Sequence, residues 1–162
     1  WLLRLQDSGL SPTTANHCLS CLKLILKQAV RQGLLPSNPA ANVERLARFL
    51  DATPRGHRWA LEVRHESWLC DEVYDLLRAH DAALVIHDML PDHPREVTAG
   101  WVYLRFHGDH YAGSYSPQAL SAWAKRIRRW LARGRDVYAF FNNDAEAHAP
   151  ANALDLRRYV RK

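Results

Sequence analysis

Four stretches of the chain repeat one arrangement: Ala60-Leu-Glu-Val-Arg-His65, Ala83-Leu-Val-Ile-His-Asp88, Trp101-Val-Tyr-Leu-Arg-Phe-His107 and Val137-Tyr-Ala-Phe-Phe-Asn-Asn-Asp144. Each is a short β-rich run that ends in ionisable or amide side chains, and a helical pattern usually follows it. Alternation of strands and helices predicts a parallel sheet. Such folds place their chemistry at the carboxyl ends of the strands. The four stretches therefore predict an α/β fold and the location of its site.

Helical patterns surround these strands. One runs from Ser67 to His80, a second starts at Ser116-Pro117 and closes at Gly134, and a third runs from about Pro150 to Tyr159. The second pattern is amphipathic, with an apolar stripe at Leu120, Trp123, Ala124, Ile127, Trp130 and Leu131. Its opposite side carries basic residues, for which a solvated outer face is favoured over a nucleic-acid patch: Lys125, Arg126, Arg128, Arg129 and Arg133.

The N-terminal segment is also predicted to be helical. Ser11 followed by Pro12 is typical of a helix start, and Gly33 is typical of a helix end. Apolar residues recur between them at three- and four-residue spacing, which predicts one apolar face: Cys18, Leu22, Ile25, Leu26 and Ala29. Cys18 and Cys21 form a Cys-x-x-Cys pair, which we interpret as apolar filling of a helix face rather than a zinc or redox site.

Composition and charge exclude several classes of protein. The chain has 162 residues, 48% hydrophobic and 24% charged, as in ordinary globular proteins, and contains no apolar run long enough to span a membrane. Three cysteines do not form a disulfide framework, which favours a reducing cytoplasm. The formal charge of +5 is uneven, because residues 1–46 hold five basic and two acidic residues. That excess is a mild indication of a polyanionic partner.

From Glu44 onward the chain resembles the YecE-like family, a domain of unknown function numbered 72. The matching stretches, in order, are ERLARFLDATP, WALEVRHESW, ALVIHD, WVYLRFHG, YSPQALSAWAKRI, GRDVYAFFNND and HAPANAL. The resemblance implies a (β/α) barrel of TIM type, of which residues 44–162 would supply the second half, about four strands. The family's reaction is unknown, so the resemblance implies no mechanism, and the half-barrel is expected to be catalytically inactive and to need no cofactor.

Residues 1 to about 46 resemble the core-binding (SAM-like) domain of phage integrases, the tyrosine recombinases, and residues 1–43 are taken as this helical segment. The resemblance rests on GLSPTT at residues 9–14 and QAVRQGLLPSNPA at residues 28–40. It implies a small helical segment that contacts DNA, and it is the alternative function for the chain. We expect weak, non-specific binding and no strand exchange, because no tyrosine lies in a recombinase-like context. The candidate DNA contacts are Thr13, Thr14, Lys23, Lys27 and Arg31.

Strand alternation predicts which polar side chains meet at the mouth of the half-barrel. Leu61 and Val63 are expected to face the helices, so that Glu62 and Arg64 point inward. The candidate catalytic residues are Glu62, Arg64, Asp88, Arg105, His107 and Asn142, with His65 nearby. One interpretation is an ion-pair network, Glu62–Arg64 or Glu62–Arg105. The other, which we favour, is an anion or sugar-phosphate site with arginines as clamps and His107 or Glu62 as acid or base.

Two further expectations concern ligands and partners. His65, His107, His110 and Asp88 are suitable metal ligands, but no tight spacing links them, so no metal is expected. His80, His93 and His148 are interpreted as surface or loop histidines. An open half-barrel would keep two unpaired sheet edges and an uncovered inner face, from which we expect self-association. We expect no membrane contact, because no apolar run is long enough to span a bilayer.

Overall fold

The computed structural model describes residues 11–34, 39–108 and 113–162. The chain divides into two compact units, one made of Trp1–Arg55 with Ser67–Leu76 and the other of Gly56–Glu66 with Leu77–Lys162. No helix among the described residues is both long and apolar enough to cross a membrane. His110, one of the candidate metal ligands, lies outside the described residues.

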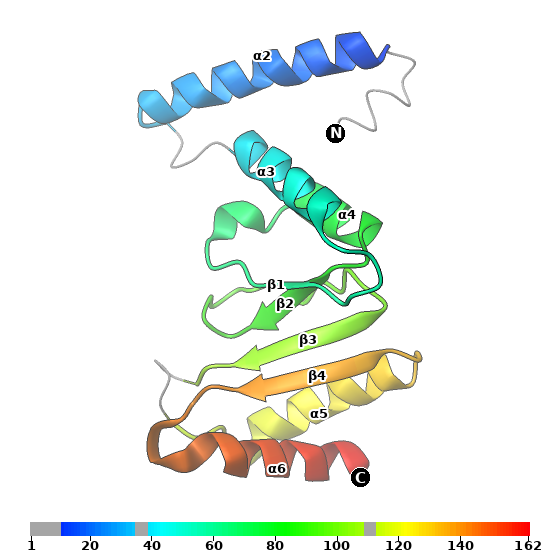
Figure 1. Cartoon of the computed structure of the whole chain (residues 1–162). Helices are drawn as coiled ribbons and strands as arrows, with labels where there is room; N and C mark the ends of the chain where they lie inside the picture. The colour runs from blue at the N-terminus through cyan, green and yellow to red at the C-terminus, as the bar shows by residue number, and fades with distance from the viewer. Residues whose placement is uncertain (1–10, 35–38, 109–112) are drawn as a thin grey trace. The chain divides into compact units, whose positions relative to one another are not determined.

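The first unit is helical (Figure 1). It contains α2 (Pro12–Arg31), α3 (Pro39–Ala52) and most of α4 (Asp71–Ala79), which follows the 3-10 turn η1 (Glu66–Trp68). Its buried side chains include Leu46 and Leu50 of α3 with Val73 and Tyr74 of α4. Helix α2 therefore begins and ends close to where Ser11, Pro12 and Gly33 predicted, whereas α4 begins at Asp71 rather than at the predicted Ser67.

The apolar side of α2 differs from the prediction. None of its described side chains is buried, and Leu24 and Ile25 are 66% and 65% exposed. Cys18 and Cys21 are exposed free thiols, so they do not fill an apolar face as expected. An amphipathic pattern buries a face only where a complementary surface lies against it, and the pattern alone does not supply that surface.

The second unit is built on a parallel sheet with strand order β1-β2-β3-β4. The strands are β1 (Ala60–Leu61), β2 (Ala83–His87), β3 (Trp101–Phe106) and β4 (Asp136–Phe141). The three pairs of neighbouring strands are all parallel, and Arg105 is aligned with His87 of β2 and with Phe140 of β4. Successive strands along the chain are thus neighbours in the sheet, and all four carboxyl ends point the same way (Figure 1).

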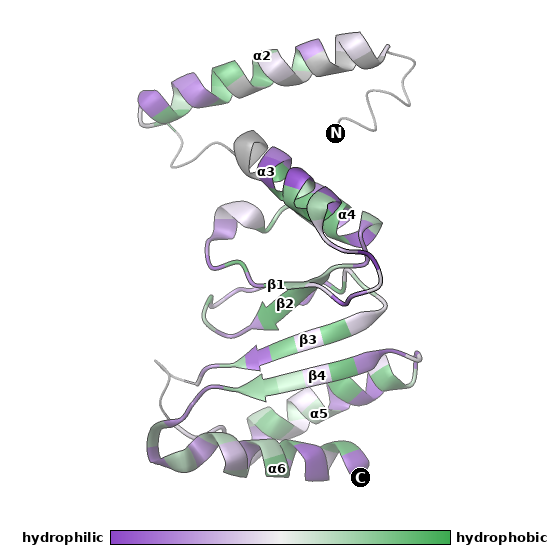
Figure 2. Ribbon diagram, viewed as in Figure 1, coloured by the Kyte–Doolittle hydropathy of each residue, from purple (hydrophilic) through white to green (hydrophobic). Residues whose placement is uncertain are grey.

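Helices α5 (Pro117–Leu131) and α6 (His148–Arg161) cover one face of this sheet. Alternate residues of β3 pack against them, and the strand is apolar along most of its length (Figure 2). The core of this layer comprises Ile86, Val102, Leu104, Phe106, Leu120, Ala124, Ile127 and Leu156. The intervening residues of β3 and β4 lie on the other face, because side chains alternate along a strand.

That inner face carries an aromatic cluster beside charged residues. Tyr103 stacks on Phe140 at 4.9 Å between ring centroids, and Trp101 meets Tyr138 edge-on at 5.6 Å. Tyr138 and Phe140 remain 42% and 47% exposed. Alternation along β3 and β4 places Tyr103 and Phe140 on this face.

The α/β prediction is confirmed, with differences at the boundaries. The run Ala60–His65 forms only a two-residue strand, and residues 88–100 connect β2 to β3 without a helix. The last helix begins at His148, after the 3-10 turn η2 (Ala145–Ala147). The domain boundary near residue 44 stays a prediction.

Candidate functional site

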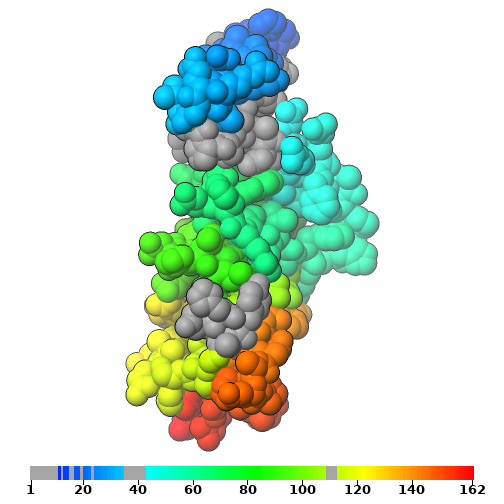
Figure 3. Space-filling model, turned by 90° about the vertical axis from the view of Figure 1, so that its left-hand side faces the viewer, coloured from blue at the N-terminus to red at the C-terminus, as the bar shows by residue number. Residues whose placement is uncertain are grey.

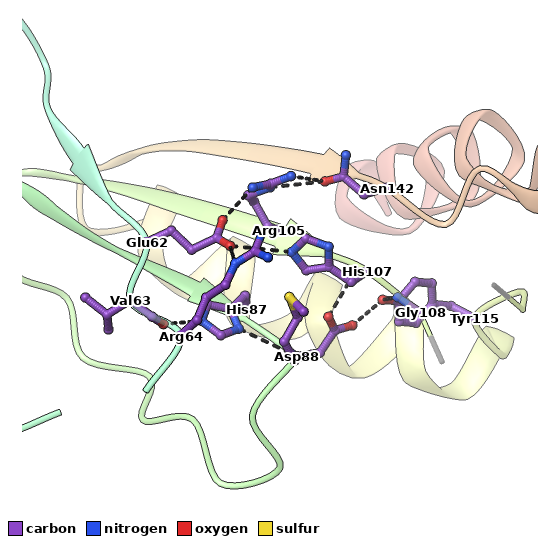
Figure 4. Close-up of polar contacts among 11 residues, drawn as sticks. Glu62, Val63, Arg64, His87, Asp88, Arg105, His107, Gly108, Tyr115 and Asn142 are labelled. Carbon is purple, nitrogen blue, oxygen red and sulfur yellow. Dashed lines mark hydrogen bonds and ion pairs between the residues drawn. The ribbon is translucent and has the colours of Figure 1, made fainter. Parts of the chain in front are cut away.

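The candidate residues gather at the carboxyl end of the sheet, which faces the viewer in Figure 3. In a parallel sheet all strands end at the same edge, so residues far apart in sequence become neighbours there. Arg105 lies in β3, and the residues that follow the strands are Glu62, Asp88, His107 and Asn142. Figure 4 shows these five side chains directed toward one another.

Arg105 is the centre of the first cluster (Figure 4). Its Nη1 donates to Glu62 Oε2 at 2.6 Å, and its Nε and Nη2 both donate to Asn142 Oδ1, at 3.1 and 2.9 Å. The guanidinium therefore links the segment after β1 to the segment after β4. Its side chain is 28% exposed, so part of the charge remains open to solvent.

Glu62 accepts hydrogen bonds from two arginines. Besides Arg105, the Nε of Arg64 donates to Glu62 Oε1 at 2.7 Å. Burial opposes ionisation of Glu62, but the hydrogen bonds from Arg64 and Arg105 prevail and lower its pKa. Both proposed ion pairs are thus present at once. Two guanidinium groups donate to one carboxylate in this cluster.

His107 joins the first cluster to a second one. Its side chain is 1% exposed, and its Nε2 lies 4.0 Å from Glu62 Oε1. Burial lowers the pKa of His107, and the charge of Arg105 lowers it further. The ring is therefore neutral near pH 7, with a nitrogen close to an ionised carboxylate.

The second cluster is organised by Asp88 and Tyr115. Asp88 Oδ1 accepts from the backbone N–H of His107 at 2.9 Å, and the Tyr115 hydroxyl donates to Asp88 Oδ2. The same hydroxyl accepts from the N–H of Gly108 at 2.5 Å. Burial raises the pKa of Tyr115, and the bond to Asp88 raises it further, so the phenol stays protonated. Tyr115 was not among the predicted site residues.

Two buried asparagines hold Tyr115 in place. Asn143 Nδ2 donates to the carbonyl of Gly113 at 2.8 Å and to Asn152 Oδ1 at 2.9 Å. Asn152 Oδ1 also accepts from the backbone N–H of Tyr115 at 3.1 Å, while its Nδ2 donates to Ser114 Oγ at 3.0 Å. This network connects the end of β4 and the start of α6 to the segment before α5.

His87 and His93 are further site residues that sequence reasoning missed. The Met89 N–H donates to His87 Nδ1 at 3.2 Å, which leaves Nε2 to donate to the Val63 carbonyl at 2.8 Å. His87 is therefore held as a neutral tautomer that ties β2 to the end of β1. The sequence signal that could have found His87 is strand alternation, which places it on the same face as its aligned residue Arg105.

His93 lies in the loop between β2 and β3, in line with the expected surface or loop position, but its side chain is buried at 8% exposure. Its ring lies 4.2 Å from that of His87, and its Nδ1 donates to the Pro94 carbonyl at 2.8 Å. Burial lowers the pKa of His93, and the neighbouring His87 lowers it further. No local pattern in the loop indicated this contact.

The remaining predicted residues are two that follow β1 and the five candidate DNA contacts. Arg64 and His65 are exposed beyond β1, with Arg64 directed back to Glu62. The candidate DNA contacts all lie in α2, where the Thr14 hydroxyl is 2.9 Å from Ser11 Oγ at the helix start: Thr13, Thr14, Lys23, Lys27 and Arg31. Among the described residues, no group of three or more His, Cys, Asp or Glu side chains is arranged to hold a metal ion.

Comparison with solved structures identifies the same architecture elsewhere. A DUF72 family protein from Thermotoga maritima MSB8 is 30% identical, with a TM-score of 0.66 over 75% of this chain and 52% of that one. A DUF72 family protein from Enterococcus faecalis V583 is 20% identical, with a TM-score of 0.65 over 75% of this chain and 54% of that one, and shows the fold alone. The chain thus spans about half the length of the structures that it matches.

The family comparison covers almost the whole chain. The model of the protein family of unknown function DUF72 matches residues 17–162, which includes most of α2. The resemblance of that segment to integrases therefore receives no support, and neither does the DNA-binding function that it implied. The chain belongs to the DUF72 family.

Proposed function

We propose that the carboxyl end of the sheet binds a small anion, such as the phosphate or carboxylate group of a metabolite. The observation that carries this proposal is that the guanidinium groups of Arg64 and Arg105 both converge on Glu62 at this end of the sheet. Guanidinium groups present planar pairs of N–H donors that match phosphate and carboxylate oxygens. The side chain of Arg105 is 28% exposed, and a partly buried charge attracts an anion more strongly than a fully exposed one does.

His107 is the better candidate for proton transfer at this site. Glu62 is a poor base, because its two arginine partners favour the ionised form. His107 is neutral and lies beside both Glu62 and Arg105, so it can accept a proton from a bound ligand. Glu62, Arg105 and His107 lie together at one end of the sheet, which gives no support to the expectation that the chain is inactive.

The proposal can be tested with Arg64→Gln, which removes one guanidinium and leaves the Arg105–Glu62 pair intact. The unfolding midpoint is measured in phosphate and in chloride at equal ionic strength, since a ligand that binds only the folded state raises it. Wild type should be more stable in phosphate, and R64Q should lose that difference. Arg158→Gln is the control, because it removes one exposed arginine charge from α6.

If phosphate raises the unfolding midpoint of R64Q as much as that of wild type, the proposal is contradicted. Glu62, Arg64 and Arg105 would then form a structural ion-pair network. In that case Arg105→Gln should destabilise the fold strongly, because Glu62 would lose a partly buried partner. The two interpretations therefore predict different effects of phosphate on the unfolding midpoint of R64Q.

We further propose that the sheet is the latter half of a TIM-type (β/α) barrel. The parallel strands follow chain order, and helices α5 and α6 cover one face, as in such barrels. Polar contacts also cross the inner face from the segment before β1 to β4, since Arg58 donates to Asp136 at 2.6 Å and to the Tyr138 hydroxyl at 2.9 Å. These contacts fit a strongly curved sheet.

An open inner face predicts self-association of the 162-residue chain. Tyr138 and Phe140 are exposed there, and within the described residues β4 pairs only with β3. Light scattering at low micromolar concentration should give a mass above the monomer, and Phe140→Lys should reduce it. A monodisperse wild-type monomer would contradict self-association.

A further inference from the structure

A basic surface lies on the helix-covered side of the sheet. We call it the arginine–tryptophan patch and define it by Arg95, Trp123, Lys125, Arg126 and Arg129. The guanidinium carbons of Arg95 and Arg126 lie over the Trp123 ring, at 5.6 and 5.4 Å from its centroid. Arg95 comes from the connection between β2 and β3, and the other four residues belong to α5. The fold therefore adds Arg95 to the basic residues that the sequence of α5 supplies.

The patch lacks carboxylates. Within the described part of the chain, none of its four basic side chains forms an ion pair, whereas Arg58, Arg78 and Arg158 pair with Asp136, Glu96 and Asp155. Arg129 instead directs its Nε to the Lys125 carbonyl, at 3.4 Å.

The cations of the patch also repel one another. Burial lowers the pKa of Arg126, and the charges of Arg95 and Arg129 lower it further. Concentrated charge of one sign without counter-charges is typical of a surface that meets a polyanion.

We propose that the arginine–tryptophan patch binds the phosphodiester backbone of nucleic acid. Stacking on Trp123 orients the guanidinium forks of Arg95 and Arg126, and such forks pair with phosphate oxygens. The indole itself also packs against Phe106, at 5.2 Å between centroids, so the two arginines are held over a rigid base. Four cations contact few phosphates, so binding is weak, independent of sequence and strongly reduced by salt.

The burial of α5 argues against a lipid surface as the partner. Leu120, Ala124 and Ile127 form the apolar side of this helix and are buried against the sheet. A helix that lies in a membrane interface needs its apolar side free to enter the lipid. The patch therefore offers charge without the apolar area that membrane binding uses.

The test measures fluorescence anisotropy of a labelled DNA duplex and a labelled single strand with the full chain over a range of salt concentrations. The double variant Arg95→Gln with Arg126→Gln should bind about tenfold more weakly at low salt, and its log–log salt slope for duplex should fall by about 1.8, or 0.9 for each lost contact. The matched control is Arg157→Gln with Arg161→Gln, which removes the same charge from exposed positions of α6. The control should bind as wild type does.

Three results would overturn the proposal: no binding of either nucleic acid by wild type, an equal loss of affinity in the control, or binding only to phosphatidylserine vesicles or polyglutamate. Circular dichroism verifies that both double variants are folded. The phosphate-dependent stabilisation proposed for Arg64 and Arg105 should persist in the patch variant, which separates the two sites experimentally.

Discussion

Helices α2 and α5 begin and end alike but differ in what surrounds them. Ser11 and Ser116 each accept a hydrogen bond from the backbone N–H three residues on, at 3.2 and 3.1 Å, and a proline follows each serine. Near their other ends stand Gly33 and Gly134, with φ of +71° and +74°.

The two helices differ in burial. Helix α5 buries Leu120, Ala124 and Ile127, whereas no described side chain of α2 is buried. Local signals therefore specify that a helix forms, and only a partner surface decides whether it contributes to a core.

The largest expected difference between the two helices comes from truncating one apolar side chain in each. Leu120 is 1% exposed and packs in the outer-face core, so Leu120→Ala should lower the free energy of unfolding by about 3 kcal/mol. Ile25 is 65% exposed, so Ile25→Ala should change it by less than about 0.5 kcal/mol. Urea unfolding followed by tryptophan fluorescence measures both. Equal losses would show that α2 is buried by a partner in solution.

A second test uses pH, because two of the histidines buried in the unit that contains α5 have lowered pKa values. The pKa values of His93 and His107 are lowered in the fold, so between their folded and unfolded pKa values the unfolded chain binds more protons. Stability is thus fully present above about pH 6.5, the unfolded value, and is lost as pH falls below it.

The measurement for this second test is the urea midpoint at about pH 7.5 and 5.5. His93→Gln removes one titrating group and should flatten the dependence. Glu62 adds a separate loss at lower pH, because its pKa is also lowered and protonation breaks its arginine pairs. A urea midpoint that does not change between the two pH values would contradict the assignment of neutral buried histidines.

The smallest expected difference comes from the helix caps. Ser116→Ala should cost about 1 kcal/mol of the free energy of unfolding, because α5 is part of the packed core. Ser11→Ala should leave the unfolding midpoint unchanged and only reduce the helical circular dichroism signal, since α2 can fray without exposing a core. Ser11→Asp, which retains a capping oxygen, should restore that signal.

The candidate site also contains some residues that local sequence patterns predict and others that only the folded chain brings together. Glu62, Arg105 and Asn142 could be predicted to meet, because each follows or ends a strand and parallel strands end together. His93, Tyr115 and Asn152 could not, because each reaches the site through a loop or a helix start whose path no local pattern specifies. Asn152 is 2% exposed, and its side chain forms hydrogen bonds with Asn143, Tyr115 and Ser114, although its place in the sequence is that of an ordinary helical residue.

The sequence by itself determined the parallel sheet, the capped starts of α2 and α5 and the alternation of side chains along the strands, since these depend on residue spacing and on local capping chemistry. The tertiary structure alone decided that α5 is buried while α2 is exposed, that Arg95 joins Arg126 over Trp123, and that Tyr115 contacts Asp88. The physical reason is range: hydrophobic periodicity and caps act over a few residues, whereas burial, charge pairing and pKa depend on groups that only the folded chain brings together.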